Sequence, residues 1–451
     1  MRRKDLCIFP IMGQEIKGAQ SYLERSGFIM DMGALSLIML VAAIAIGFFL
    51  NVNVGLVSIF FAVILGYGSG QFTGKEIISG WSGSLFMTLA GITLVFAIVQ
   101  SNNSLELLIR KIINKLGKAV VLVPIVYFVF AWLVSAAGPG LIPTAALVTV
   151  LAVPLAHETG FHPLMLSMTA VAAANAGRFT MLTVEGNLIT DLLEAQGYTK
   201  NVMMGVCVSS TILAIILSVV YYIWYKGYKV RQGMGKATEV SKFTKEQIVS
   251  LIGMLVMVIL ILVFKFEASL AAFSVGATLI ILRVGDQKAA LKAMPWGTMI
   301  LVCGVGVLMN LVVELGGIDL LSSGLASIMT ESTAAGFSGL TAGILSLFSS
   351  TLGVVLPTLI PTVGSLIAKV GAAVTPMELC AAIGFASSTS GISPASTAGA
   401  LTMGAMTSDP EFAEKYKPEK LFMELLIWAL VSVGIVVLVA FIGFFRWFSV
   451  L

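Results

Sequence analysis

The sequence predicts an all-α polytopic membrane protein made of two inverted repeats, each with five transmembrane helices plus one re-entrant hairpin, and with interrupted helices. Of its 451 residues, 58% are hydrophobic and 11% are charged, a composition outside the range of soluble domains. Apolar runs of about 17 to 22 residues recur from Leu35 to Phe448, each long enough to cross roughly 30 Å of hydrocarbon. Three landmarks also recur in order at a spacing of about 214 residues, which indicates a duplication.

The landmarks combine Gly, Pro and small polar residues, and each has a counterpart in the second half of the chain. They are Gly80-Trp81 with Gly91 and Pro295-Trp296 with Gly306; Ser135, Gly138 and Pro143 with Ser350, Gly353 and Pro357; and residues 174–177 with 387–391. We therefore expect a first repeat over residues 31–226, a basic linker over 227–246 and a second repeat over 247–451. Residues 1–30 form an interfacial arm, or precede the true start at Met30 or Met32; both interpretations stay open.

The first repeat begins with crossings expected at about 33–50, 54–70 and 82–103 and ends with one at about 200–225. From Leu105 to Leu116, apolar residues recur at helical spacing opposite a basic face, which predicts a helix lying in the membrane interface. The stretch at about 119–157 is apolar but broken from Ser135 to Gly140. Because open backbone groups at membrane depth must lie inside protein or beside water, this break predicts a re-entrant hairpin. An interrupted segment is expected at about 162–195.

The second repeat shows the same order. Its crossings are expected at about 247–264, 267–283, 296–314 and 419–447, its interfacial stretch at about 318–329, its hairpin at about 335–370 with the tip at 349–353, and its interrupted segment at about 376–405. Each repeat makes an odd number of crossings, so the second must insert in the opposite orientation.

Charge predicts the orientation. The linker is rich in Lys and Arg, which favours the cytoplasmic side of a bacterial inner membrane. Counting crossings from the linker places three further basic segments on the same side: Arg110 to Lys118, Arg283 to Lys292 and Lys415 to Lys420. The formal charge of +4 fits such loops better than a nucleic-acid surface.

The motifs of pumps and proteases are missing from the sequence. Gly74-Lys75-Glu76 lacks the rest of a phosphate-binding loop, and neither HExxH nor GxSxG occurs, so we expect neither enzyme activity nor a cofactor. His157 and His162 flank a turn and are interpreted as an interfacial loop pair rather than a metal site. The two hairpin tips and two interrupted helices remain. A helix broken at mid-membrane offers N–H groups and a positive dipole end to an anion, and its carbonyls and hydroxyls to a cation.

Arg178 stands out because a charge inside an interrupted span needs a partner or water. Three roles are open: it binds a substrate carboxylate, it pairs with Glu185 seven positions on, or it extends to the cytoplasmic interface. Glu185 is a candidate proton carrier, or it marks the outer end of its segment together with Asp191 and Glu194.

The motifs Ser135 to Gly140, Ala173 to Gly177 and Ser349 to Thr358 resemble those of the ion transporter superfamily, which includes the divalent anion/Na⁺ symporters. Within it, the layout over about residues 31–450 looks like the SLC13-type permeases and the MatC-like malonate and C4-dicarboxylate carriers. The resemblance implies paired cation and carboxylate sites, separate scaffold and transport domains, elevator motion and a homodimer joined through the first two crossings of each repeat.

The resemblance also implies site residues at the tips and the interrupted helices. For the substrate they are Ser135, Gly138, Asn175, Ser350, Thr351, Ser388 and Thr389, together with Arg178; for a cation they are Ser135, Asn175, Gly177, Ser349, Gly353 and Ser390. The tips read Ser135-Ala-Ala and Ser350-Thr-Leu where similar carriers have Ser-Asn-Thr, so Na⁺ and H⁺ both stay open as the coupling ion.

We therefore expect a secondary active transporter that takes up a small carboxylate, such as a C4-dicarboxylate or malonate, with a cation. An exporter or cation/H⁺ antiporter of the same superfamily is the alternative, and it predicts an essential carboxylate at Glu185. A passive channel is a further alternative, and an intramembrane enzyme is the least favoured.

Overall fold

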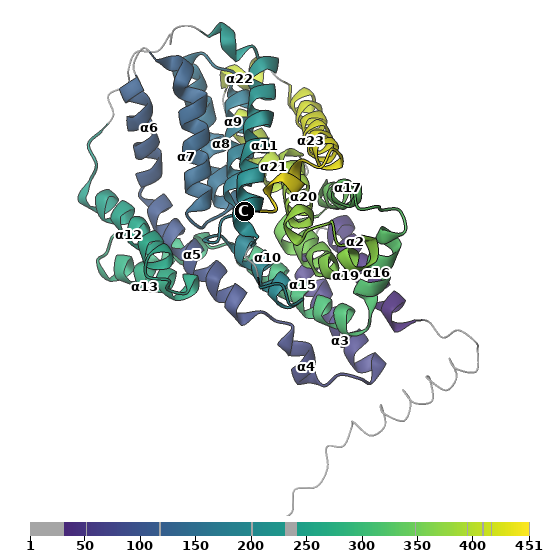
Figure 1. Ribbon diagram of the computed structural model, residues 1–451. Helices are drawn as coiled ribbons and strands as arrows, with labels where there is room; N and C mark the ends of the chain where they lie inside the picture. The colour runs from purple at the N-terminus through teal and green to yellow at the C-terminus, as the bar shows by residue number, and fades with distance from the viewer. Residues whose placement is uncertain are drawn as a thin grey trace, which may run out of the picture.

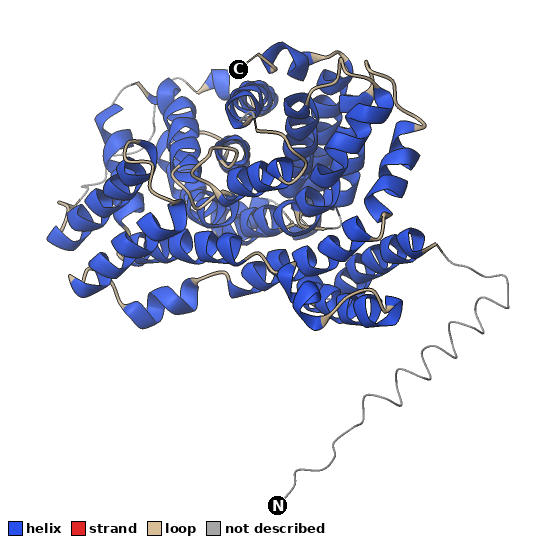
Figure 2. Cartoon of the chain, turned by 60° about the horizontal axis from the view of Figure 1, so that its bottom comes forward, coloured by secondary structure: helices blue, strands red, loops and turns tan. Residues whose placement is uncertain are grey.

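The computed structural model describes residues 31–450 except 51, 117–118, 200–201, 231–240, 348, 395, 408–409 and 416. The predicted arm at 1–30 and the middle of the predicted linker lie outside the described residues. Within the described part, all regular structure is helical, and Figure 2 shows helices joined by short loops. The predicted all-α fold is confirmed.

The first half of the chain contains three long helices, a short amphipathic helix, two broken segments and a fourth long helix, in the predicted order. The bounds are α2 Met32–Leu50, α3 Val54–Ser69, α4 Gly74–Ser79, α5 Gly83–Ser101, α6 Ser104–Leu116, α7 Val123–Ala136, α8 Leu141–Thr159, α9 Pro163–Gly177, α10 Val184–Glu194 and α11 Met203–Trp224.

The second half presents the same order of elements. The bounds are α12 Lys245–Leu262, α13 Ala268–Ile281, α14 Gln287–Ala293, α15 Trp296–Glu314, α16 Gly317–Ala326, α17 Ala334–Leu347, a π-helical turn η3 Thr351–Val355, α18 Leu356–Leu359, α19 Val363–Val370, α20 Pro376–Thr389, α21 Thr397–Thr407, α22 Pro410–Lys415 and α23 Pro418–Phe441. The element order is thus repeated, while the inversion of the second copy stays a prediction.

The two halves interlock through their first three long helices. Helix α5 packs against α12 and α13, and α15 packs against α2 and α3, so each half lends one helix to the other. In Figure 1, α12 and α13 lie beside α5 at one edge of the molecule, and α2 and α3 lie near α15 at another. Side chains of α2, α3 and α15 form a hydrophobic core separate from the larger one that contains the broken segments.

Each broken segment ends where the sequence loses its helix-forming residues. Helix α7 ends at Ala136 before the Gly-Pro-Gly run, and α8 starts after Gly140, which has a φ of 69°. Helix α17 ends at Leu347, and the side chain of Ser350 then accepts a hydrogen bond from Gly353 N at 3.2 Å. Helices α9 and α20 stop at Gly177 and Thr389. The predicted breaks are therefore present at all four positions.

Seven helical stretches among the described residues are long and apolar enough to cross a membrane. Two of the seven, residues 141–159 and 351–370, are second arms of the predicted hairpins, whereas α2, α3 and α13 are shorter apolar helices. Helix α12 is the least buried of the seven, with 11% of its window inside the protein. The protein is therefore a multi-pass membrane protein whose outer helices present apolar faces to lipid.

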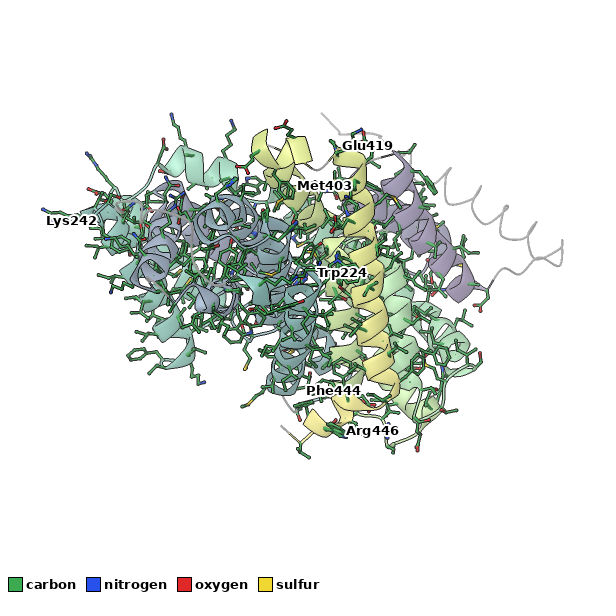
Figure 3. All side chains as sticks on the ribbon, turned by 90° about the horizontal axis from the view of Figure 1, so that it is seen from above. Trp224, Lys242, Met403, Glu419, Phe444 and Arg446 are labelled. Atoms are coloured by element: carbon green, nitrogen blue, oxygen red, sulfur yellow. The ribbon has the colours of Figure 1, made fainter. Side chains whose placement is uncertain are left out.

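Polar contacts between helix ends join residues that the crossing count places on the same side. Asn53 Nδ2 donates to Gly297 O at 2.8 Å, and Asn102 Nδ2 donates to Ser250 Oγ at 2.6 Å, both on the predicted cytoplasmic side. On the other side, Arg446 Nη2 donates to Glu331 O at 2.6 Å. Figure 3 shows Glu419 and Arg446 near opposite ends of α23. The contacts agree with the predicted order of crossings, and the cytoplasmic assignment of the linker stays a prediction.

Candidate functional site

A cavity of about 210 Å³ lies where the two hairpin tips and the two interrupted helices meet. Its lining comprises Leu141, Ile142, Arg178, Ser346, Leu347, Ser349, Ser350, Thr351, Leu352, Gly391, Ser396, Thr397 and Ala398. All four broken segments contribute to the lining. Four of the predicted site residues are among the lining residues, namely Arg178, Ser349, Ser350 and Thr351. The others are not: Ser135, Gly138, Asn175, Gly177, Gly353, Ser388, Thr389 and Ser390. The volume is below the roughly 300 to 1,000 Å³ of pockets for drug-sized ligands, so the cavity suits a small solute.

The cavity offers donors that suit a negatively charged solute. Arg178 is the one charged residue among the described residues that line it. Helix α8 begins at Leu141, η3 at Thr351 and α21 at Thr397, so three helical N-termini reach the same space. Because free N–H groups and the positive end of the helix dipole lie at an N-terminus, each adds to the attraction for a negative charge.

Arg178 forms a buried ion pair with Glu185. Its Nε and Nη2 lie 3.0 and 2.5 Å from the same carboxylate oxygen, Oε1, and the two side chains are 4% and 5% exposed. Its Nη1 lies 3.5 Å from Ser388 Oγ, at the limit of a hydrogen bond. Of the three roles that the sequence leaves open, extension to the interface is therefore wrong for this conformation, because the arginine is buried and paired.

One matched contact in each half holds the hairpin against its interrupted helix. In the first half, Ser135 Oγ donates to Ala174 O at 2.7 Å. In the second half, Ser346 Oγ donates to Ser387 O at 2.8 Å. The hydroxyl of Thr351 adds a second hydrogen bond to Ser387 O at 3.0 Å. The same donor type thus meets the last turn of the interrupted helix in both halves.

Asn175 has a side chain with no exposed surface, and neither Oδ1 nor Nδ2 has a hydrogen-bond partner among the described residues. It follows Ala174, the acceptor of the Ser135 hydroxyl, so it lies beside the first matched contact. A buried amide without partners is costly, because it loses its hydrogen bonds to water and gains none. The amide thus offers an unused oxygen, of the kind that Na⁺ or a carboxylic acid requires.

The remaining predicted residues serve the backbone or the packing around the cavity. Gly177 lies against Trp132 O, where a Cβ would come within 2.5 Å. The tip glycines Gly138 and Gly353 face Ile92 of α5 and Leu301 of α15, whose side chains an added Cβ would approach to 2.9 and 2.5 Å. The hydroxyls of two further residues donate to carbonyls of their own helix: Thr389 to Ala386 O and Ser390 to Ser387 O.

Sequence reasoning missed three hydroxyl residues of the cavity: Ser346, Ser396 and Thr397. The oxygen of Ser396 lies within hydrogen-bond distance of Gly391 O, which closes the loop after the second interrupted helix. The signal for Ser346 was its place one residue before the end of α17, because Ser135 stands one residue before the end of α7. The sequence landmarks matched Ser135 with Ser350 instead.

A second, larger cavity of about 480 Å³ lies away from the breaks, at the ends of α8 and α11 and beside α22. His157, His162, Tyr225, Glu411 and Phe412 contribute to its lining. The imidazole of His162 stacks on Tyr225 at 4.4 Å between ring centroids, and burial lowers the pKa of this histidine to about 4. Because no helix is broken there, we place the candidate site at the smaller cavity.

Comparisons with known proteins agree with a membrane carrier fold. A family model described as the N-terminus of dicarboxylate carrier protein MatC matches residues 30–178. Comparison with curated protein sequences finds no match. The YdaH transporter of Alcanivorax borkumensis is similar in fold, with a TM-score of 0.55 and 13% identity over 82% of this chain and 87% of that chain.

A second solved structure with a similar fold is MtrF of Neisseria gonorrhoeae, described as illuminating a class of antimetabolite efflux pumps. Its TM-score is 0.54 and its identity 14%, over 82% of each chain. At these identities the likeness is one of fold. The match to the MatC N-terminus includes α2 to α9 and ends at Arg178, the charged residue of the cavity.

Proposed function

We propose that this protein is a secondary active transporter that takes up a small carboxylate together with a cation. The observation that carries the proposal is the cavity at the four broken segments, in which Arg178 and three helical N-termini surround a space lined with hydroxyls. A planar guanidinium binds a carboxylate through two donors, and N-terminal N–H groups add to the binding. The match to a dicarboxylate carrier family over residues 30–178 favours a C4-dicarboxylate or malonate among the small anions.

Movement of the site across the membrane would follow the boundary between the broken segments and the interlocked long helices. Gly138 contacts α5 and Gly353 contacts α15, so both tips touch this boundary at residues without a side chain. Small residues allow two elements to slide past each other at close range. We therefore place the transport domain in α7–α11 and α17–α23, and the scaffold in α2–α5 and α12–α15, for an elevator-type motion.

Helix α12 supports the proposal that the scaffold forms a homodimer. Only 11% of its apolar window is buried, so this surface meets lipid or a second copy of the chain. The homodimer would join the first two helices of each repeat. Cross-linking of the membrane-embedded protein, through single cysteines along α12, would yield a dimer band if this surface is the interface.

Uptake of radiolabelled succinate, malate and malonate into proteoliposomes tests the function. We expect accumulation above the medium concentration when an inward H⁺ or Na⁺ gradient is imposed. Arg178→Ala should reduce uptake at least about 30-fold, because loss of a buried charge-assisted pair costs about 2 kcal/mol or more. Arg110→Ala is the matched control, because Arg110 forms a partly exposed pair with Glu106 at 3.1 Å on α6, away from the cavity. Absence of gradient-driven uptake for every carboxylate would contradict the proposal.

Export in exchange for H⁺ is the second candidate. It requires a buried carboxylate that carries protons independently of substrate binding, and Glu185 is buried. The fold is also similar to that of MtrF, which is described as illuminating a class of antimetabolite efflux pumps. In that case, inside-out vesicles would accumulate the solute and right-side-out vesicles would not. Orientation-controlled vesicles therefore separate the two directions.

A further inference from the structure

Arg178 already holds a carboxylate that belongs to the protein. The Nε and Nη2 of its guanidinium both contact Glu185 Oε1, and Nη1 lies at the limit of a hydrogen bond to Ser388 Oγ. Arg178 lines the cavity, whereas Glu185 is not among the lining residues. A carboxylate that enters the cavity would therefore meet a guanidinium that already binds Glu185.

The second carboxylate oxygen of Glu185 makes the pair incomplete. Oε2 is buried and has no hydrogen-bond partner among the described residues. It lies against Gly140, where a Cβ would come within 2.8 Å of it. Buried ion pairs that serve stability are normally saturated with hydrogen bonds, because desolvation of both charges must be offset. Glu185 is held through one oxygen only, which makes it replaceable at Arg178.

Arg178 is the one charged partner that Glu185 has in the described structure. Helix α10 packs against α5, α18 and residues 360–362, and none of these contains an ionisable residue. The hairpin tip at 135–141 also contains none. On its own helix, Asp191 and Glu194 lie one and a half turns or more beyond Glu185. If Arg178 turned to another anion, Glu185 would become a buried carboxylate without a counter-charge, which a bound proton would neutralise.

We propose that Glu185 is a resident competitor for Arg178 and thereby couples transport to H⁺. This inference rests on the proposed uptake of a small carboxylate. One carboxylate of the substrate takes over the guanidinium, and Glu185 leaves it and binds one proton from the aqueous side. Before the exchange, the charges of Arg178 and Glu185 sum to zero. After it, the charges of Arg178, the bound substrate carboxylate and the protonated Glu185 also sum to zero. Release of the substrate returns the proton and restores the ion pair.

Substrate binding to the purified protein at several pH values tests the exchange. Between the pH at which Glu185 loses its proton in the free protein and the higher pH at which it loses it in the substrate complex, wild-type affinity should fall about tenfold per pH unit, since one proton is bound with the substrate. Glu185→Gln should lose this slope, keep solute counterflow in proteoliposomes and no longer accumulate substrate from an H⁺ gradient. Glu194→Gln, an exposed carboxylate on the same helix, is the matched control and should keep the wild-type slope.

The outcomes separate this inference from the proposed function. Wild-type protein that shows no counterflow of any carboxylate would overturn the function and with it the exchange. Wild-type counterflow with an unchanged pH slope in Glu185→Gln would overturn the exchange alone. A measurement on the wild type avoids reliance on a folded variant: addition of substrate in weak buffer should withdraw about one proton per site, read from a pH indicator. Binding without proton uptake would refute the exchange.

Discussion

Gly55 of α3 and Gly304 of α15 lie in direct backbone contact. A Cβ on Gly304 would come within 2.4 Å of Gly55 O, and a Cβ on Gly55 would come within 2.3 Å of Ile300 O. At the other contact between the halves, Gly91 of α5 lies against α13, where a Cβ on Gly91 would come within 3.0 Å of Ser269 O. Lipid offers no hydrophobic drive for helix association, so such close approach of small residues supplies the packing that joins the two halves.

Gly304→Leu should therefore weaken the scaffold. A side chain at this position has no space, and overpacking of this kind costs about 1 to 3 kcal/mol. We expect a lower apparent melting temperature in detergent and a smaller monodisperse fraction on size-exclusion chromatography. Gly434→Leu is the control, because Gly434 of α23 has no atom within 4 Å of its Cβ position. Equal melting temperatures for the two variants would show that the α3 to α15 contact is dispensable.

Ser346→Ala should impair transport more than it impairs folding. The hydroxyl lines the cavity and ties α17 to the last turn of α20 through Ser387 O. Its loss removes about 0.5 to 1.5 kcal/mol of hydrogen bonding, which corresponds to a few-fold to tenfold weaker substrate binding. Labelled-substrate binding and the melting temperature would be measured side by side. Ser218→Ala on α11, whose hydroxyl donates to its own helix at Ala214 O, should leave both unchanged.

Asn175→Leu distinguishes a ligand from a structural amide. Because neither amide atom has a partner in the described structure, an apolar side chain of similar size should leave the melting temperature unchanged or raise it. Uptake should nevertheless be lost, since the unused amide oxygen and nitrogen are available to substrate or cation. Loss of thermal stability together with uptake would indicate a structural role instead.

The broken segments could be predicted from the sequence because their cause is local. Glycine and proline are favoured at helix ends, and the break after Ala136, at Gly138-Pro139-Gly140, and the break after Gly177 follow from composition. Apolar length and amphipathic spacing likewise predicted α5, α6 and α15 within a few residues. These features depend on residues close in sequence, which is why they required no knowledge of packing.

The equivalence of Ser135 in the first half and Ser346 in the second could not be predicted from the landmarks, because the two hairpin tips differ in length. Ala136, the last residue of α7, lies seven positions before Pro143, whereas Leu347, the last of α17, lies ten before Pro357. The longer spacing in the second half includes the π-helical turn η3, Thr351–Val355. Alignment on Gly138 and Gly353, which each follow a serine by three positions, matched Ser135 with Ser350, a position beyond the end of the helix.

The ion pair of Arg178 with Glu185 was one of the three roles that the sequence left open, but its geometry could not be predicted, because it comes from a turn. A spacing of seven places two residues on one face of a continuous helix, but the chain leaves the helix between Arg178, just after α9, and Glu185 in the first turn of α10. The hydroxyl of Thr183 accepts from Gly186 N at 3.2 Å and fixes where α10 begins. The pair is therefore set by this cap and turn, which spacing alone did not reveal.

A double-mutant cycle on Arg178 and Glu185 should reveal strong coupling of their contributions to stability. Removal of either partner leaves the other as a buried, unpaired charge, which costs about 3 to 5 kcal/mol, whereas removal of both avoids that cost. We therefore expect Arg178→Leu and Glu185→Leu each to lower the melting temperature strongly, and the double variant to lie closer to wild type than either. The melting temperatures of all four proteins, taken in one detergent at one pH, complete the cycle. Effects that simply add would show that the two side chains contribute to stability independently, and not as an ion pair.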